Sequence, residues 1–234
     1  MKNIRINFSF YLFVIILLLN KLEDIMNQPK IDEDYLTKGS FFDIYNEEDY
    51  FLSNYLIKDE LVEKQMISHP MIEQTLFQHV TFSECDFDKS DLTDIIFKNC
   101  DLSNCHFTDS SLFRVKFQNC KMLGTDFNGS YFNNIQFDNC ILDLANLNQL
   151  NCKGVNFTNS SLKDVSFNDN KLSKVIFDNC DLNEMIVMNT KLKGIDWSNC
   201  RFETIEVDQN YLRGLKLNRE QAAFFAQNFL GVKL

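Results

Sequence analysis

The sequence predicts an all-β protein, a parallel β-helix with four sides and twenty residues in each coil. First, every fifth residue from Phe82 to Leu217 is apolar over 28 consecutive positions, with the small Cys152 as the one partly polar member. A period of five matches neither an α-helix nor a plain strand, but it fits three extended residues followed by a corner. Second, a Phe-x-Asn-Cys segment, with Ser in place of Cys at residue 160 and Trp in place of Phe at residue 197, recurs at every fourth such unit from Phe97 to Cys200, so four units complete one coil.

A second inward position lies two residues before each apolar centre. It holds small or aliphatic residues such as Cys85, Ser90 and Ile95, with Asn170 and Asn210 as larger polar exceptions. No charged residue occupies either position between Val80 and Leu217. Residues two apart in a strand point to the same side, so both positions face the interior. The 28 units predict about seven coils over residues 77–217 and a rod roughly 34 Å long.

Residues separated by one full coil are expected to lie directly above one another, which predicts two columns. The inward column and its small neighbours form the predicted structural core: Phe97, Phe117, Phe137, Phe157, Phe177, Trp197, Cys100, Cys120, Cys140, Cys180 and Cys200. The second column is a ladder of amides: Asn99, Asn119, Asn139, Asn159, Asn179 and Asn199. Stacked amides can hydrogen-bond along such a column.

This pattern, with Phe or Leu at the centre and a small residue two before it, resembles the bacterial pentapeptide-repeat family over roughly 60% of the chain. The resemblance implies a right-handed quadrilateral β-helix. The C-terminal stretch from Arg213 to Val232 is similar to the Qnr-like, quinolone-resistance branch of that family, in which C-terminal helices mediate a homodimer.

The sequence offers no catalytic, cofactor-binding or metal-binding constellation. All eight cysteines fall on inward positions, where a small, readily buried side chain is expected. Reduced inward thiols favour a reducing compartment, and therefore a cytoplasmic protein. His69, His79 and His106 have no partner at metal-ligand spacing, and no phosphate loop or nucleophile elbow is present. A filled rod also lacks the concave site that catalysis needs.

The C-terminal segment, residues 218–234, predicts a helical cap. Asn218 and Gln221 have the spacing of a capping box, and Gly231 is a natural helix terminator. Ala222, Phe225, Ala226 and Phe229 would form one apolar face. The cap and dimer residues are expected to be Leu217, Phe224, Phe225, Phe229 and Leu230.

The N-terminal part is less regular. Residues 26–76 are acidic and predict a cap or an arm, with short helices over residues 46–56 and 58–67. Residues 1–25 hold Lys2, Arg5 and an apolar run over residues 8–19 without a small-x-small cleavage site. Three interpretations stay open: translation starting at Met26, a leader for secretion or membrane anchoring, or a hydrophobic segment docked on the fold.

The leading functional hypothesis is a non-enzymatic, Qnr-like DNA mimic that binds DNA gyrase or topoisomerase IV and protects against quinolones. The formal net charge of −10 disfavours direct nucleic-acid binding. The charge match to DNA is imperfect, since about 34 Å of duplex carries roughly 20 charges. The alternatives are a scaffold for another protein partner, or a secreted or membrane-tethered surface protein if the leader is real.

Overall fold

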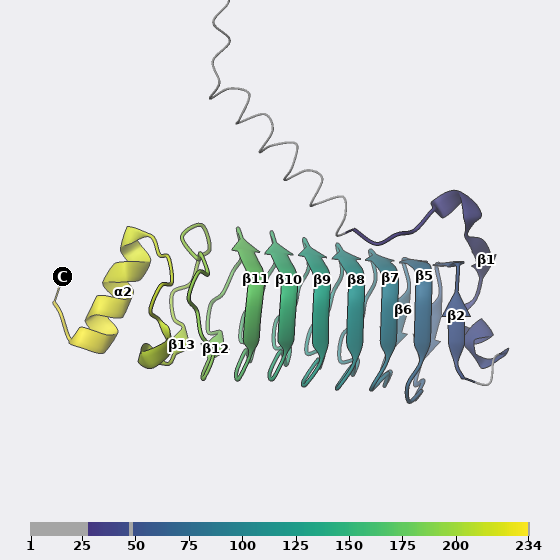
Figure 1. The fold of residues 1–234 in the computed structure, drawn as a ribbon, viewed down its shortest axis with the longest axis horizontal. Coiled ribbons are helices and arrows are strands. Elements are labelled where there is room, and N and C mark those ends of the chain that lie inside the picture. The colour runs from purple at the N-terminus through teal and green to yellow at the C-terminus, as the bar shows by residue number, and fades with distance from the viewer. Residues whose placement is uncertain (1–27, 47–48, 234) are drawn as a thin grey trace, which may run out of the picture.

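The computed structural model describes residues 28–46 and 49–233, which form a parallel β-solenoid of about eight turns. Figure 1 shows the strands following one another along the rod, with the helix α2 (Arg219–Leu230) at its C-terminal end. The main sheet contains β1 (Thr37–Gly39), β2 (Phe51–Ser53), β3 (Tyr55–Lys58), β5 (Met71–Gln78), β7 (Asp91–Lys98), β8 (Ser111–Gln118), β9 (Tyr131–Asp138), β10 (Asn151–Thr158) and β11 (Lys171–Asp178). Two further parallel pairs are β4 (Leu61–Glu63) with β6 (Thr81–Ser83), and β12 (Ile186–Val187) with β13 (Glu206–Val207). The 3-10 helices are Glu33–Tyr35, Phe41–Asn46 and Gln209–Tyr211.

The register between neighbouring coils is the twenty-residue offset that the sequence predicts. Phe97 pairs with Phe117, Phe117 with Phe137, and Phe137 with Phe157. Each coil has four sides, named here by their centres in one coil: side 1 by Phe97, side 2 by Leu102, side 3 by Phe107 and side 4 by Leu112. The eight-residue strands β5 and β7 to β11 run along side 4, round the corner and along side 1.

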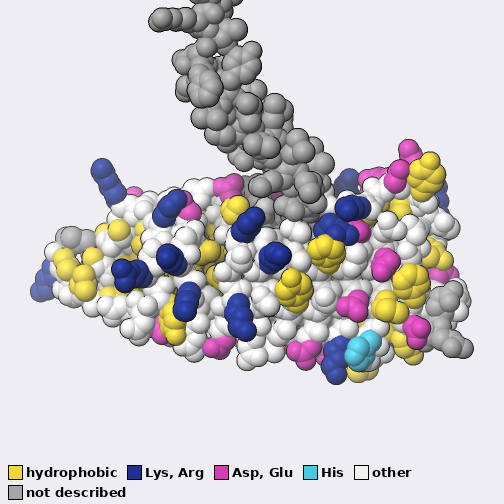
Figure 2. Space-filling model, in the orientation of Figure 1, with side chains coloured by type: hydrophobic (Ala, Val, Ile, Leu, Met, Phe, Trp, Pro, Cys, Tyr) yellow, Lys and Arg dark blue, Asp and Glu magenta, His cyan; other side chains and the backbone are white. Residues whose placement is uncertain are grey.

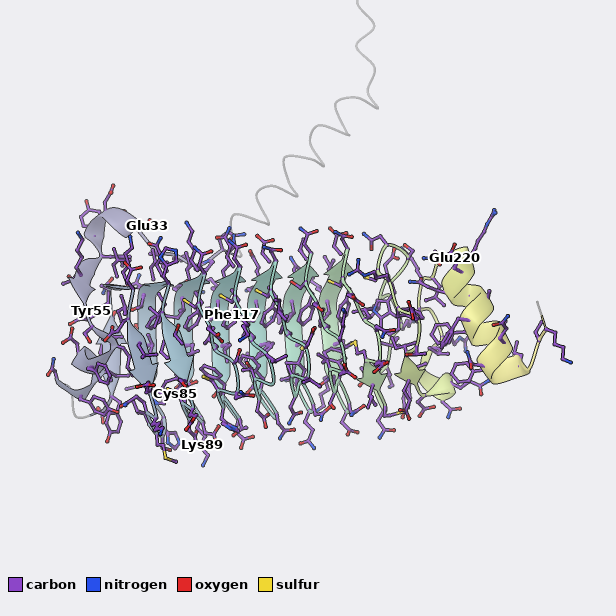
Figure 3. The ribbon with its side chains drawn as sticks, turned by 180° about the vertical axis from the view of Figure 1, so that it is seen from behind. Glu33, Tyr55, Cys85, Lys89, Phe117 and Glu220 are labelled. Carbon is purple, nitrogen blue, oxygen red and sulfur yellow. The ribbon has the colours of Figure 1, made fainter. Side chains whose placement is uncertain are left out.

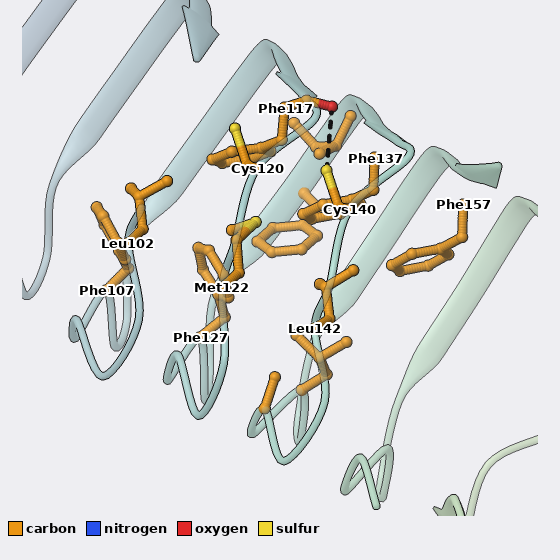
Figure 4. Close-up of a cluster of buried hydrophobic side chains, with 14 of the residues drawn as sticks. Leu102, Phe107, Phe117, Cys120, Met122, Phe127, Phe137, Cys140, Leu142 and Phe157 are labelled. Carbon is orange, nitrogen blue, oxygen red and sulfur yellow. Dashed lines mark hydrogen bonds between the residues drawn. The ribbon is translucent and has the colours of Figure 1, made fainter. Parts of the chain in front are cut away.

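Stacked aromatic rings fill the side-1 column. From Phe77 to Phe177 the centroids of neighbouring rings are 4.9–5.0 Å apart. The rings are nearly parallel, with interplanar angles of 3–11°. Figure 4 shows Phe117, Phe137 and Phe157 in this arrangement. Trp197 ends the stack, because its ring lies at 84° to that of Phe177.

The corners have a backbone conformation that explains their composition. The residue two after each centre has a positive φ along much of the rod, for example Asn99 at 55°, Asn119 at 54° and Asn139 at 55°. Asn and Gly tolerate this left-handed region better than other residues do. Gly124 and Gly129 occupy the same corner position. The frequent Asn at this position is therefore a consequence of the corner as well as of side-chain stacking.

The solenoid begins earlier than the sequence analysis predicts. Residues 51–76, assigned above to an acidic cap or arm with two short helices, form strands β2, β3 and β4 and the first part of β5. The centres continue backwards as Ile72, Ile67, Val62, Ile57 and Leu52, all of them buried. The prediction failed because the second inward position there holds large residues.

Two of those large residues contact the segment that closes the N-terminal end. Glu60 accepts hydrogen bonds from the Ser40 hydroxyl at 2.6 Å and from the Phe41 N–H at 2.9 Å. Gln65 accepts one from the Tyr45 hydroxyl at 2.6 Å. Phe41 is buried against the rings of Phe82 and Phe87, both 5.6 Å away. The 3-10 helix Phe41–Asn46 is thus the N-terminal cap, and residues 51–76 belong to the solenoid that it covers.

The C-terminal lid is α2, with the predicted capping box and a left-handed Gly231 at its end. Its contact face differs from the prediction, because Ala222 is exposed and Gln221 is buried. The Gln221 amide donates to the carbonyls of Trp197 at 2.9 Å and Cys200 at 3.0 Å, near the C-terminal end of the rod. Within the described residues, no helix is long and apolar enough to cross a membrane.

Candidate partner-binding surfaces

The predicted core residues all lie inside the rod. The five Phe residues, Trp197 and the five cysteines of that set are each at most 5% exposed. All eight cysteines are buried and unpaired by disulfides, as their inward positions predict.

The second inward position on sides 2 to 4 often holds a hydrogen-bond donor as well as a small side chain. The Cys140 thiol donates to the Phe117 carbonyl, 23 residues earlier, at 3.4 Å, as Figure 4 shows. Ser130 and Thr190 make the corresponding bond at 2.8 and 3.1 Å. On side 1, which continuous strands cross, the position holds Val or Ile instead, as at Val115. The sequence analysis attributed this position to size alone and missed the hydrogen bonds that its Cys, Ser and Thr residues donate.

The amide column is present in part. Asn119 donates to Asn99 at 3.0 Å, Asn139 to Asn119 at 2.8 Å, and Asn179 to Asn159 at 2.8 Å. Asn199 binds the Asp178 carboxylate instead of Asn179. Towards the N-terminus the column continues through His79, whose ring lies 3.0 Å from the Asn99 amide and 3.1 Å from an Asp59 carboxylate oxygen.

Acidic side chains gather on side 3 and its two corners, a surface called here the acidic side. Of its outward positions between residues 64 and 209, ten are acidic and only Lys64 and Lys89 are basic. The acidic residues are Glu84, Asp86, Asp88, Asp109, Asp126, Asp164, Asp169, Glu184, Glu206 and Asp208. The overall acidity of the chain is therefore concentrated on one surface of the rod.

Like charges stack within the acidic side. Asp164 and Glu184 are separated by one full coil, and both are exposed. The hydrogen bond and the charge repulsion from Asp164 raise the pKa of the Glu184 carboxyl. Such repulsion is unfavourable in the isolated protein and is relieved when a cationic surface approaches.

A shallow hollow on side 2 is lined mainly by charged and polar side chains. It is lined by Lys163, Asp181, Asn183, Arg201, Phe202 and Glu203. Burial alone would raise the pKa of Asp181, but the Asn183 N–H and the Arg201 guanidinium hold it below its usual value. Lys163 and Arg201 both bind this carboxylate, at 3.4 and 3.0 Å. Across the described ranges, no group of three His, Cys, Asp or Glu side chains has the arrangement of a metal site.

The predicted cap and dimer residues divide between buried and exposed positions. Phe225 is buried and its ring stacks on Phe229 at 5.7 Å, and Phe224 contacts Phe202 at 5.7 Å. Leu217, Phe224 and Phe229 are half-buried against the core. Leu230 is 70% exposed and Val232 41%. Phe224 and Phe225 thus contact Phe202 of the rod, and Phe229 packs on Phe225, so the exposed apolar surface is smaller than the sequence suggests. Figure 3 shows Glu220 on the lid and Glu33 on the N-terminal segment, at opposite ends.

The fold and these surfaces define a repeat solenoid with regular, addressable sides. A family model described as "Pentapeptide repeat region" matches residues 90–167 and 150–223. The chain belongs to the pentapeptide-repeat family.

Similar solved structures belong to the same family. HetL, a pentapeptide-repeat protein involved in heterocyst differentiation regulation from the cyanobacterium Nostoc sp. strain PCC 7120, is 16% identical over 72% of this chain and 83% of its own, with a TM-score of 0.42. A trypsin-treated form of QnrB1, a plasmid-mediated fluoroquinolone resistance protein, is 22% identical over 78% and 98%, with a TM-score of 0.39. A thylakoid-lumen protein of Arabidopsis thaliana is 17% identical over 61% and 75%, with a TM-score of 0.30. No curated protein matches the chain.

Proposed function

We propose that this protein is a non-enzymatic binding solenoid whose acidic side mimics the phosphate backbone of DNA towards DNA gyrase or topoisomerase IV. The observation that carries the proposal is the segregation of ten acidic residues from all but two basic ones on that side. A surface of this kind complements the basic groove of a DNA-binding enzyme. Binding there would keep quinolones from acting on the enzyme, as expected of a Qnr-like protein.

The charge density of one side supports this proposal better than the net charge of the rod does. Eight coils span about 38 Å at the spacing of stacked strands. A duplex of that length carries roughly 22 phosphates, and a protein bound to one side of it contacts only part of them. Ten acidic groups on one side are of the same order as that part.

The decisive experiment measures gyrase supercoiling in the presence of ciprofloxacin, with and without the purified full chain. The variant Asp164→Lys/Glu184→Lys reverses two exposed charges on the acidic side. Its matched control, Asp91→Lys/Asp138→Lys, changes the net charge equally on sides 4 and 1. We expect the wild type and the control to restore supercoiling and the acidic-side variant to lose at least tenfold in potency. Absence of protection by the wild type would refute the gyrase assignment.

The second candidate function is a scaffold that uses the same acidic side to bind a basic protein other than gyrase or topoisomerase IV. An affinity capture with the wild type and the same two variants distinguishes the candidates. A partner other than gyrase or topoisomerase IV, retained by the control and lost by the acidic-side variant, would favour the scaffold.

We further propose a homodimer joined through the lid. Leu230 and Val232 are exposed, and Phe224 and Phe229 are only half-buried, so a two-fold partner would cover apolar side chains at this end of the rod. Light scattering at micromolar concentration tests this assembly, and a monomer mass would exclude it. The buried, reduced cysteines suit a cytoplasmic location, which fractionation of the native protein would check.

A further inference from the structure

Six basic side chains lie together on side 4 in the C-terminal half of an otherwise acidic rod. This basic patch consists of Lys153, Lys171, Lys174, Lys191, Lys193 and Arg213, all of them exposed. From Tyr131 to Gly214, no outward residue of side 4 or of its corner with side 1 is acidic. Figure 2 shows Lys and Arg side chains gathered over the C-terminal half of this face, while Asp and Glu lie mainly towards the N-terminal end and the lower edge.

The solenoid arranges these charges in nearly one plane. Strands β10 and β11 carry Lys153, Lys171 and Lys174, and the next two coils carry the others. The patch runs through four coils, from Lys153 to Arg213, and measures about 14 Å along the rod at the spacing of stacked strands. Because these side chains leave the same flat side of the solenoid, their charged ends reach a common plane.

The patch has no role in holding together the described part of the chain. None of its six residues forms an ion pair with a residue that the structure describes. By contrast, Lys121, Lys163 and Arg201 on side 2 each bind an aspartate, at 3.3, 3.4 and 3.0 Å. Six unpaired like charges within a few coils repel one another, and an anionic partner would relieve that repulsion.

Among anionic partners, a membrane surface fits the shape and the borders of the patch. A bilayer presents anionic headgroups in a plane, whereas a duplex is convex and would meet a flat side with few phosphates at once. Tyr131 lies on the same side one coil before the patch and is 37% exposed, and Tyr211 lies on that side in the last coil of the patch. Amphipathic rings of this kind favour the headgroup region. Clustered Lys and Arg are attracted to anionic leaflets over about one Debye length.

We propose that the basic patch binds the anionic headgroups of a membrane surface and holds the rod there reversibly. Side 4 then faces the bilayer. Side 3 with its acidic residues, although adjacent, points along the membrane plane and stays accessible to a protein partner. This surface is separate from the one in the proposed function, and its test uses different residues.

The experiment is co-sedimentation of the full chain with vesicles of phosphatidylcholine, either alone or with about one third of the lipid replaced by phosphatidylglycerol. The patch variant is Lys171→Glu/Lys191→Glu/Lys193→Glu. The control is Lys58→Glu/Lys89→Glu/Lys98→Glu, which makes the same change in net charge at exposed lysines elsewhere on the rod. Thermal melting shows whether both variants stay folded.

We expect the wild type to bind the anionic vesicles at least tenfold more tightly than the neutral ones, and about 500 mM NaCl to abolish the difference. The patch variant should lose at least tenfold in this binding, while the control keeps most of it. Equal binding to both vesicle types, or equal losses in the two variants, would overturn the proposal. Tighter binding of a short DNA duplex at matched phosphate concentration, dependent on the same three lysines, would also overturn it and assign the patch to nucleic acid.

Discussion

Arg114 lies one coil beyond Asp94 and binds both of its carboxylate oxygens, with Nε 2.6 Å from Oδ1 and Nη2 2.5 Å from Oδ2. The side chains are only 13% and 6% exposed, so most of this ion pair is removed from water. The guanidinium also lies 3.9 Å above the Phe113 ring. Asp94 accepts a third hydrogen bond, from the Lys30 N–H at 2.8 Å, and thereby connects the N-terminal segment to the solenoid. The hydrogen bond with Asp94 raises the pKa of Arg114.

Removing both members of this pair should cost less stability than the two single losses added together. Asp94→Ala leaves a shielded guanidinium without its partner, and we expect a loss of about 2–4 kcal/mol in the free energy of unfolding. Arg114→Ala should behave similarly, and the double variant should cost less than the sum of the two. Urea denaturation of the three variants measures the coupling. The exposed pair Lys121–Asp101 is the control, with an expected coupling below about 1 kcal/mol. Additive losses at Asp94 and Arg114 would contradict the arrangement.

A charge placed in the ring stack should disrupt the rod, while the neighbouring residue should tolerate change. Phe137→Asp puts a carboxylate into a fully buried column, where an unpaired ion costs about 4 kcal/mol or more. Asp138→Ala alters an outward side chain on the same strand and should change the free energy of unfolding by about 0.5 kcal/mol or less. Equal melting temperatures for the two variants would be incompatible with the register described above.

Replacing Asn139 by glycine should cost less stability than replacing it by the β-branched residue valine. Its φ of 55° lies in the left-handed region, where valine is strained by about 1–3 kcal/mol. Asn139→Gly keeps that conformation and loses only the exposed hydrogen bond to Asn119, so its cost should be about 1 kcal/mol or less. Thermal unfolding of both variants separates the two effects. A valine variant as stable as the glycine variant would mean that side-chain stacking, and not the corner, selects asparagine.

Alkaline pH should weaken the fold partly through Cys152. Burial raises the pKa of this thiol to about 12, so the folded protein retains its proton above pH 9 while the unfolded chain loses it. The unfolded state then binds fewer protons, and the free energy of unfolding falls with rising pH between about 9 and 12. Cys152→Val removes this group, and its stability should decline less steeply by about 1.4 kcal/mol per pH unit. Urea titrations at pH 9, 10 and 10.5 compare the slopes, and parallel curves would refute the linkage.

The interior was predictable because a single short period controls it. Each centre from Phe82 to Leu217 needs a side chain that can be buried, and Cys152 meets this need because it is small and buried. Each residue two before a centre must fit between neighbouring coils. The same reasoning failed for Leu52 to Ile72. There the capping segment supplies hydrogen bonds to Glu60 and Gln65, and large polar residues replace the small ones that would have extended the pattern.

By itself, then, the sequence determined the repeat, the length of one coil, the inward cysteines and the capping box of the lid. These features depend on neighbours at fixed separations along the chain, from two residues up to one full coil. Only the tertiary structure decided that Lys30 of the N-terminal segment binds Asp94, that Ser40 and Tyr45 bind Glu60 and Gln65, and that Gln221 binds carbonyls of the last coils. Those features depend on segments that meet at no fixed spacing, such as Lys30 with Asp94, 64 residues apart. A periodic pattern carries no information about such contacts, because they arise where the regular coil meets the irregular chain around it.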